Sequence, residues 1–197
     1  EFNKIIVATG SKPKTMGMKV DGHHIMTSDE ALRRETLPKS VIIIGGGVIG
    51  VEWASMYSDF GVEVTLLEFL PGLLPTADAE VAAELEKLMK RRKINIVTGA
   101  AVQTDSVTVA DGMVTLQAKI GDELKSFTAE SVLVSVGREP VAKNLGLENR
   151  EKIKYTKAGF IEVNGFGQTA DPVIYAIGDV VGGGLAHVAA HQGIIAM

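Results

Sequence analysis

The sequence predicts an α/β fold, in which a parallel βαβαβ sheet with helices on both sides is joined to a three-stranded antiparallel β-meander. Three observations lead to this prediction. An apolar run at residues 41–44 enters a glycine-rich turn at 45–50, strand and helix patterns alternate from there to residue 98, and short strands separated by tight-turn dipeptides follow. The 197 residues, 46% of them hydrophobic, suffice for one sizeable core.

The first half of the chain supplies the alternating elements. Residues 13–38 are a connector with one short helix near 29–34, and Pro38 marks entry to the sheet. The elements expected next are strand 40–44, helix 48–60, strand 63–68, helix 77–92 and strand 94–98. In the second helix we expect Thr76 as the N-cap, with the cationic residues 90–93 beside the negative end of the helix dipole.

The second half begins with the meander. Its expected strands are 106–110, 113–120 and 123–129. Asp111-Gly112 and Gly121-Asp122 suit the tight turns between them, and the alternation of apolar and polar residues predicts one buried face. The apolar run 131–136 then predicts another buried parallel strand, which ends at Gly137.

The glycine-rich turn is the most informative motif, because glycines at these positions are typical of a Rossmann-like dinucleotide site. Gly45 permits the tight turn, Gly47 lets the backbone approach a pyrophosphate, and Gly50 lets the helix pack closely on the strand. Free N–H groups and the dipole at the helix start favour a phosphate there.

Glu68 ends the second predicted strand, 18 residues beyond Gly50, where the adenosine ribose should lie. Each hydrogen bond from a ribose hydroxyl to a carboxylate contributes about 1.5 to 3 kcal/mol. A 2′-phosphate at about 4 Å would instead be repelled, at a cost of about 4 kcal/mol per pair of charges with an effective dielectric near 20. Phe69 and Leu70 offer no compensating cation, so the sequence favours NAD over NADP.

Composition excludes several classes of function. A net charge of −4 gives no basic field for nucleic acid, and no apolar stretch reaches the length of a membrane span. The absence of cysteine excludes disulfides, thiol catalysis and thiolate metal sites within this chain. We expect no metal site, since the adjacent His23 and His24 fit a connector surface better than a ligand pair.

Several motifs together resemble those of the flavoprotein disulfide reductase family, and within it the NAD-binding segment of the lipoamide dehydrogenases. They occur in that family's order and span almost the whole chain: residues 8–11, 45–52, 137–140, 175–179 and 185–187. Residues 144–148, Gly at position 50 and the lack of an arginine after Glu68 favour lipoamide dehydrogenases over the NADPH-dependent glutathione reductases.

The resemblance implies roles for residues in two cofactor sites. The NAD residues would be Gly45, Gly46, Gly47, Val48, Ile49, Gly50, Val51, Glu52, Glu68, Val102 and Gly137. Among these, Val102 would lie near the adenine, Gly137 near the nicotinamide, and Glu52 would support a lysine beside the flavin. The FAD residues would be Thr9, Gly10, Ser11, Asp179, Gly184, Leu185, Ala186 and His187.

The resemblance also implies a domain organisation. Residues 1–37 would be a partial FAD-domain segment and connector, 38–160 the NAD-binding domain, and 161–197 a second partial FAD-domain segment. Because the start Glu1-Phe2-Asn3 runs directly into a strand pattern, we expect a segment of a larger protein. The redox cysteines, the upstream flavin site and the downstream histidine base of the family are not in this segment.

The intact enzyme would oxidise dihydrolipoamide through a disulfide and FAD and reduce NAD⁺, whereas the segment would bind NAD(H) without turnover. Its partners would be a lipoyl carrier domain of a 2-oxoacid dehydrogenase or glycine cleavage complex and a second copy in a homodimer, with no nucleic acid or membrane. Its place would be the bacterial cytoplasm or an organelle matrix. Alternatives are a mercuric reductase, an NADH oxidase, a non-catalytic NAD-sensing module, or a methyltransferase, which the meander and Gly178-Asp179 do not fit.

Overall fold

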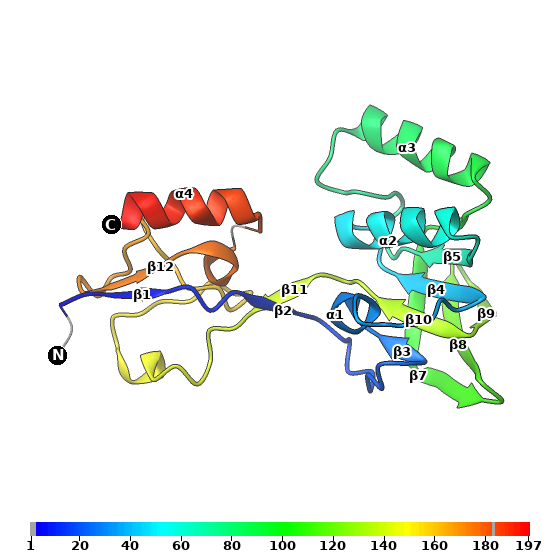
Figure 1. Ribbon diagram of the computed structural model, residues 1–197, viewed down its shortest axis with the longest axis horizontal. Helices are drawn as coiled ribbons and strands as arrows, with labels where there is room; N and C mark the ends of the chain where they lie inside the picture. Colours follow the sequence, from blue (N-terminus) through cyan, green and yellow to red (C-terminus); the bar gives the residue numbers. More distant parts are fainter. Residues whose placement is uncertain (1–2, 183) are drawn as a thin grey trace. The chain divides into compact units, whose positions relative to one another are not determined.

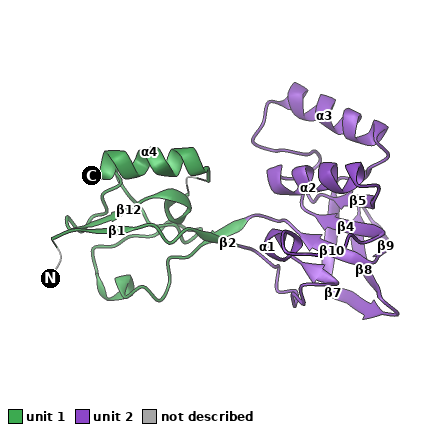
Figure 2. Cartoon of the chain, viewed as in Figure 1, with its two compact units in different colours: residues 1–12, 138–197 green, residues 13–137 purple. Residues whose placement is uncertain are grey.

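The computed structural model describes residues 3–182 and 184–197, and the chain divides into two compact units (Figure 2). Unit 2 is Pro13–Gly137, and unit 1 combines Glu1–Lys12 with Arg138–Met197. Each unit has its own buried core. No helix among the described residues has the length and apolar character needed to cross a membrane.

Unit 2 is built on a parallel sheet with the strand order β3-β10-β4-β5-β6 (Figure 1). These strands are β3 Ile25–Met26, β10 Ser131–Val134, β4 Ser40–Ile44, β5 Glu63–Leu67 and β6 Asn95–Val97. Every pairing between them is parallel. The central strands β4 and β10 are continuous apolar runs that are buried on both faces, as the sequence predicted.

Three helices belong to this unit: α1 Ser28–Ala31, α2 Val48–Asp59 and α3 Ala79–Arg91. All three contribute to one core cluster, in which Ala31, Ala54 and Met89 pack with the face of the sheet that carries Ile43 and Leu66. The prediction of helices on both sides is therefore wrong in this unit. Right-handed crossovers from β4 to β5 to β6 run in one direction, which leaves both crossover helices on the same face.

The opposite face of the sheet is covered by the antiparallel meander, which the sequence predicted. Its strands are β7 Ala100–Ala110, β8 Met113–Ile120 and β9 Glu123–Ala129, paired in that order. Val114, Leu116 and Ala118 pack against Ile42 and Val132 of the sheet. Strand β7 is six residues longer than predicted and changes register between Gln103 and Thr108.

The boundary of α3 also differs from the prediction. Asp78, not Thr76, is the N-cap, and its carboxylate accepts hydrogen bonds from the backbone N–H groups of Glu80 and Val81 at 3.0 and 3.2 Å. Lys90 and Arg91 lie in the last turn, beside the negative end of the helix dipole, as predicted.

In the part of unit 1 that the structure describes, there are two small sheets and one α-helix. Strand β1 Ile5–Val7 pairs in parallel with β12 Ile174–Ala176, and β2 Ser11–Pro13 pairs with β11 Arg138–Pro140. Helix α4 Ala186–Ala196 and the 3₁₀ turns η1 Leu147–Asn149 and η2 Gly178–Val181 complete it. The core clusters around Val7, Ile161, Ile174 and Val180.

The compact units begin and end elsewhere than at the predicted domain boundaries. Residues 13–37 were expected outside the central domain, yet β3 pairs with β10 and Ala31 of α1 packs in the unit 2 core. Residues 138–160 were expected inside it, yet Ala142, Leu147 and Ile153 pack in the unit 1 core. Burial of these apolar residues, which lie in a connector and a turn-rich region, decides where each unit ends.

Candidate functional site

The turn between β4 and α2 has a geometry that depends on two of its glycines. Gly45 has φ +108°, and a Cβ atom there would lie 2.5 Å from the carbonyl oxygen of Ser135. A Cβ atom at Gly50 would lie 1.9 Å from the carbonyl oxygen of Gly45. A Cβ atom at Gly47 would meet nothing within 4 Å. The turn is therefore closed on the side of the sheet and open beside Gly47, at the start of α2.

Hydrogen bonds account for most peptide groups of this turn. The N–H of Gly45 donates to Leu67 O at 2.8 Å, that of Gly46 donates to the Glu68 carboxylate, and Leu74 N–H donates to Gly46 O at 2.9 Å. Among the hydrogen bonds of residues 3–182 and 184–197, none satisfies the N–H groups of Gly47, Val48 and Ile49. These donors at the start of a 12-residue helix form an anion-binding end, because the helix dipole adds partial positive charge there.

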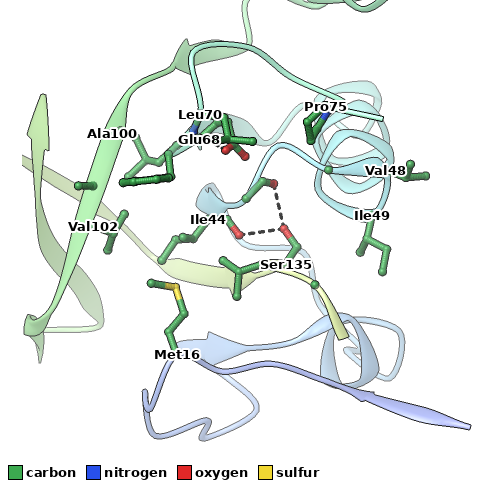
Figure 3. Close-up of a pocket in the computed structure, with 17 residues that line it drawn as sticks. Met16, Ile44, Val48, Ile49, Glu68, Leu70, Pro75, Ala100, Val102 and Ser135 are labelled. Carbon is green, nitrogen blue, oxygen red and sulfur yellow. Dashed lines mark hydrogen bonds between the residues drawn. The ribbon is translucent and has the colours of Figure 1, made fainter. Parts of the chain in front are cut away.

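Ser135, directly after β10, holds the other side of the turn. Its hydroxyl lies 3.0 Å from Ile44 O and 3.1 Å from Gly45 O, so one proton is shared between two carbonyl groups (Figure 3). This residue was not among those predicted from the sequence. The available signal was a polar residue within the apolar run 131–136, just before Gly137.

Glu68, directly after β5, is buried, with 7% of its surface exposed. One carboxylate oxygen accepts the N–H of Leu70 at 2.6 Å and the other accepts the N–H of Gly46. No ion pair of the described residues involves this carboxylate, so its negative charge is not offset by a cation. Since each oxygen has two lone pairs, one on each remains to accept a hydroxyl proton.

A cavity of about 650 Å³ lies at the carboxyl ends of β4, β5 and β10 (Figure 3). Seven predicted NAD residues line it: Gly45, Gly47, Val48, Ile49, Glu68, Val102 and Gly137. The helix start and the Glu68 carboxylate therefore face one space, whose volume is typical of a small-molecule site. Most of the other lining residues are apolar, including Met16, Ile44 and Val136.

Four other predicted NAD residues do not line this cavity. Gly46 and Gly50 are buried residues of the turn itself, and Val51 packs in the core between α2 and the sheet. Glu52 is exposed and lines a separate hollow between α2 and α3, with Ser55 and Arg92. Its predicted role depends on a lysine and a flavin from other segments, and it remains a prediction.

In unit 1 the structure brings two predicted FAD residues into direct contact. The Ser11 hydroxyl donates to the Asp179 carboxylate at 2.6 Å, and Arg138 Nε donates to Ser11 Oγ at 2.6 Å. Arg138, which was not predicted for this site from the sequence, lies 3.8 Å from Asp179. Thr9 donates to Val141 O at 2.6 Å, beside Gly10.

The remaining predicted FAD residues lie at the start of α4. Gly184, the N-cap Leu185, Ala186 and His187 are exposed, and no side chain caps the helix. Gln192 of α4 accepts the N–H of Gly178 at 2.7 Å, which ties the helix to the turn that carries Asp179. Two of the three predicted FAD segments are thus joined through the Ser11–Asp179 contact, and the third is joined to the same turn.

His23 and His24 lie in the connector, where their backbone N–H groups donate to the Asp21 carboxylate. Burial raises the pKa of the Asp21 carboxyl, but N–H donors from Ile25, His23 and His24 outweigh burial and hold that pKa below its usual value. Within the part of the chain that the structure describes, no three His, Cys, Asp or Glu side chains are grouped to hold a metal ion.

Comparisons with known proteins show which family the chain belongs to. The family model described as pyridine nucleotide-disulphide oxidoreductase matches residues 1–193. Dihydrolipoyl dehydrogenase of Bacillus subtilis is 49% identical over 98% of this chain and 41% of its own length, and that of Zymomonas mobilis is 41% identical over 100% and 42%. The chain thus spans about two fifths of the length of these curated relatives.

Solved structures of flavoprotein disulfide reductases and of related proteins also match the fold of this chain. LpdA from Mycobacterium tuberculosis matches with a TM-score of 0.88 and 32% identity, over 98% of this chain and 41% of that chain. The HOCl-induced flavoprotein disulfide reductase RclA from Escherichia coli, in its Cu(II) complex, matches with a TM-score of 0.87 and 27% identity, over 98% and 43%. The family match over nearly all residues and the agreement in fold show that this chain belongs to the pyridine nucleotide-disulphide oxidoreductase family.

Proposed function

We propose that this chain is the NAD(H)-binding portion of a dihydrolipoamide dehydrogenase. The main support for the proposal is the cavity in unit 2. Two groups face this cavity: the open N–H groups of Gly47, Val48 and Ile49, and the Glu68 carboxylate. A dinucleotide has an anionic pyrophosphate for the first group and ribose hydroxyls for the second. The open space at Gly47 is where a pyrophosphate would approach the backbone.

The fixed position of Glu68 supports a preference for NAD over NADP. Because two backbone N–H groups hold the carboxylate, it has little freedom to turn away from a 2′-phosphate. At about 4 Å and an effective dielectric near 20, each like-charge pair costs about 4 kcal/mol, which exceeds a hundredfold in affinity. Phe69 and Leu70, which follow on the cavity wall, carry no charge.

In the whole protein, FAD bound near Ser11, Asp179 and α4 would carry electrons from a cysteine pair to NAD⁺. The contacts of Ser11 with Arg138 and Asp179 give unit 1 a polar cluster that can accept hydroxyl protons of such a cofactor. The chain contains no cysteine, so the dithiol step needs other segments, and this chain alone binds NAD(H) without turning over lipoamide. A lipoyl carrier domain and a second copy of the enzyme are the proposed partners, in the cytoplasm of a bacterium.

Calorimetric titration of the 197-residue chain with NADH and NADPH tests this proposal. We expect NADH to bind at least about a hundredfold more tightly than NADPH. Glu68→Gln should reduce this preference, whereas Glu63→Gln, at the exposed opposite end of β5, should leave it unchanged. Melting temperatures of both variants would show whether the fold is retained. Equal affinities in the unmodified chain, or tighter NADPH binding, would contradict the proposal.

A further inference from the structure

The loop before β3 holds a methionine in an unusual backbone conformation. Met18 N–H donates to Thr15 O at 3.0 Å, which closes a four-residue turn, and its central residues Met16 and Gly17 have φ of +54° and +79°. Positive φ at both central positions is the pattern of a type I′ turn, where Asn, Asp or Gly is preferred first. Methionine is disfavoured there, and such outliers concentrate where a side chain has a functional position.

The Met16 side chain lines the nucleotide cavity. Its loop is tied to the end of the β10 segment, since Lys14 N–H donates to Gly137 O at 3.0 Å. Figure 3 shows the side chain rising from this loop with the sulfur directed towards Ile44, Val102 and Ser135. Among the residues that line the cavity, Met16 alone carries sulfur.

Met16 is also accessible to solvent, with 43% of its surface exposed. Met18, Met26 and Met89 are buried in the core. Met56, on α2, has a similar exposure of 40% but lines the hollow between α2 and α3 instead of the nucleotide cavity. Met16 and Met56 therefore form a matched pair: their solvent exposure is similar, but only Met16 lines the nucleotide cavity.

We propose that Met16 is an oxidation site of the nucleotide cavity, and that its sulfoxide weakens NAD(H) binding; this rests on the proposed function. A peroxide is the oxidant. The thioether sulfur attacks the OH oxygen of the peroxide, the O–O bond breaks as the S–O bond forms, and the other oxygen leaves and takes the proton that the attacked oxygen carried, as water or an alcohol. Sulfur loses two electrons and the peroxide gains them, which converts an apolar side chain into a polar one.

The effect on binding follows from the surroundings of the sulfur. Ile44, Val102 and Val136 are apolar residues that line the same cavity, so a sulfoxide oxygen of Met16 that finds no donor there stays bound to water. That hydrated group occupies space that a ring of the dinucleotide would use, and a thioether contact with that ring is lost. We expect a loss of about tenfold in NADH affinity.

The test uses the 197-residue chain treated with graded hydrogen peroxide, which is removed before calorimetry with NADH. Peptide mass spectrometry measures the sulfoxide at each methionine. NADH affinity should fall about tenfold in proportion to Met16 sulfoxide and recover after treatment with methionine sulfoxide reductase. Met56→Leu should lose affinity in the same way, whereas Met16→Leu, compared with its own untreated sample, should not.

A second measurement does not depend on the variants. Saturating NAD⁺ should slow oxidation of Met16 by peroxide and leave the rate at Met56 unchanged. Unchanged NADH affinity at full Met16 oxidation, an equal loss in Met16→Leu, or no protection by NAD⁺ would each overturn the proposal for Met16 while the proposed function stands. If the untreated chain does not bind NADH, both fail.

Discussion

A methyl group added at Gly47 would meet open space, whereas one added at Gly50 would lie 1.9 Å from Gly45 O. Gly47 also has φ −72°, which alanine adopts without strain. We therefore expect Gly47 to affect nucleotide binding, and Gly50, three residues later in the same turn, to affect the stability of the fold.

Alanine substitution tests this separation. Gly50→Ala should lower the free energy of unfolding by about 3 kcal/mol or more, because backbone must move. Gly47→Ala should change it by less than about 1 kcal/mol but weaken NADH binding, because its methyl group would occupy the space of the pyrophosphate. Urea denaturation and calorimetry measure both. Equal destabilisation by the two variants, or full NADH affinity in Gly47→Ala, would contradict the assignment.

Some residues of the site could be read from sequence and others could not. The spacing of Gly45, Gly47 and Glu68 is typical of one local geometry, a strand, turn, helix and strand in succession. All three residues line the cavity. Ser135 and Met16 reach the same cavity from segments about 90 residues after and 30 residues before the turn. Their positions depend on the pairing of β10 with β4 and on one loop conformation, which local sequence patterns do not encode.

At the scale of single elements, the N-cap of α3 offers a sharp comparison. Asp78 accepts two backbone N–H groups of the first turn, and Thr76, the residue predicted for this position, lies outside the helix. Asp78→Ala should therefore reduce the free energy of unfolding by about 1 kcal/mol, with Thr76→Ala close to neutral. Denaturation of the two variants in urea decides between them, and a larger loss for Thr76→Ala would show that the helix starts earlier.

The start of α1 makes stability depend on pH. Glu30 accepts the hydroxyl of Thr27 at 2.5 Å and its N–H at 2.8 Å, and the hydroxyl hydrogen bond above all lowers the pKa of Glu30 below its usual value of 4.5. A carboxyl with a lowered folded pKa contributes stability that is present above pH 4.5 and is lost as the pH falls through the folded pKa.

Unfolding measured between about pH 6 and pH 3 tests this contribution. The unmodified chain should lose more stability over this interval than Glu30→Gln, because the amide has no charge to lose. Glu35→Gln, a change of another glutamate in the same connector, should follow the unmodified chain. Parallel curves for Glu30→Gln and the unmodified chain would show that the hydrogen bonds between Thr27 and Glu30 add no acid sensitivity.

Elements differed in how well sequence predicted them. The bounds of β4, β8 and β9 match the prediction, since continuous or alternating apolar patterns between clear turn residues define them. Strand β3 was missed because two residues carry no periodicity, and it exists through its pairing with β10. The early part of β7 was missed because polar residues interrupt it where Ser106 Oγ bridges Gln103 O and Gln117 N–H at 2.6 and 2.8 Å.

For the whole molecule, the α/β fold and the family were predictable because separate motifs occur in one order along the chain. The limits of the compact units were not predictable from the sequence. Ala31 and Ala142 belong to a core because of the residues they pack against, and no local sequence pattern indicates this packing. The face on which the helices lie was also missed, since it follows from the order of strands in the sheet.

At this scale the proposed function predicts a binding protein without turnover. The purified chain, supplied with FAD, NAD⁺ and dihydrolipoamide, should form no NADH above the rate without protein, because it has no cysteine to exchange with the substrate dithiol. Absorbance at the NADH band measures this. Protein-dependent NADH formation would show that another group in the chain performs the thiol step.

A crystal structure of the chain with bound NAD⁺ would show whether the dinucleotide lies between the start of α2 and Glu68. We predict pyrophosphate oxygens within hydrogen-bonding distance of the N–H groups of Gly47, Val48 and Ile49, and adenosine ribose hydroxyls on the Glu68 carboxylate. NAD⁺ bound elsewhere on the chain, or bound with its ribose away from Glu68, would contradict the account.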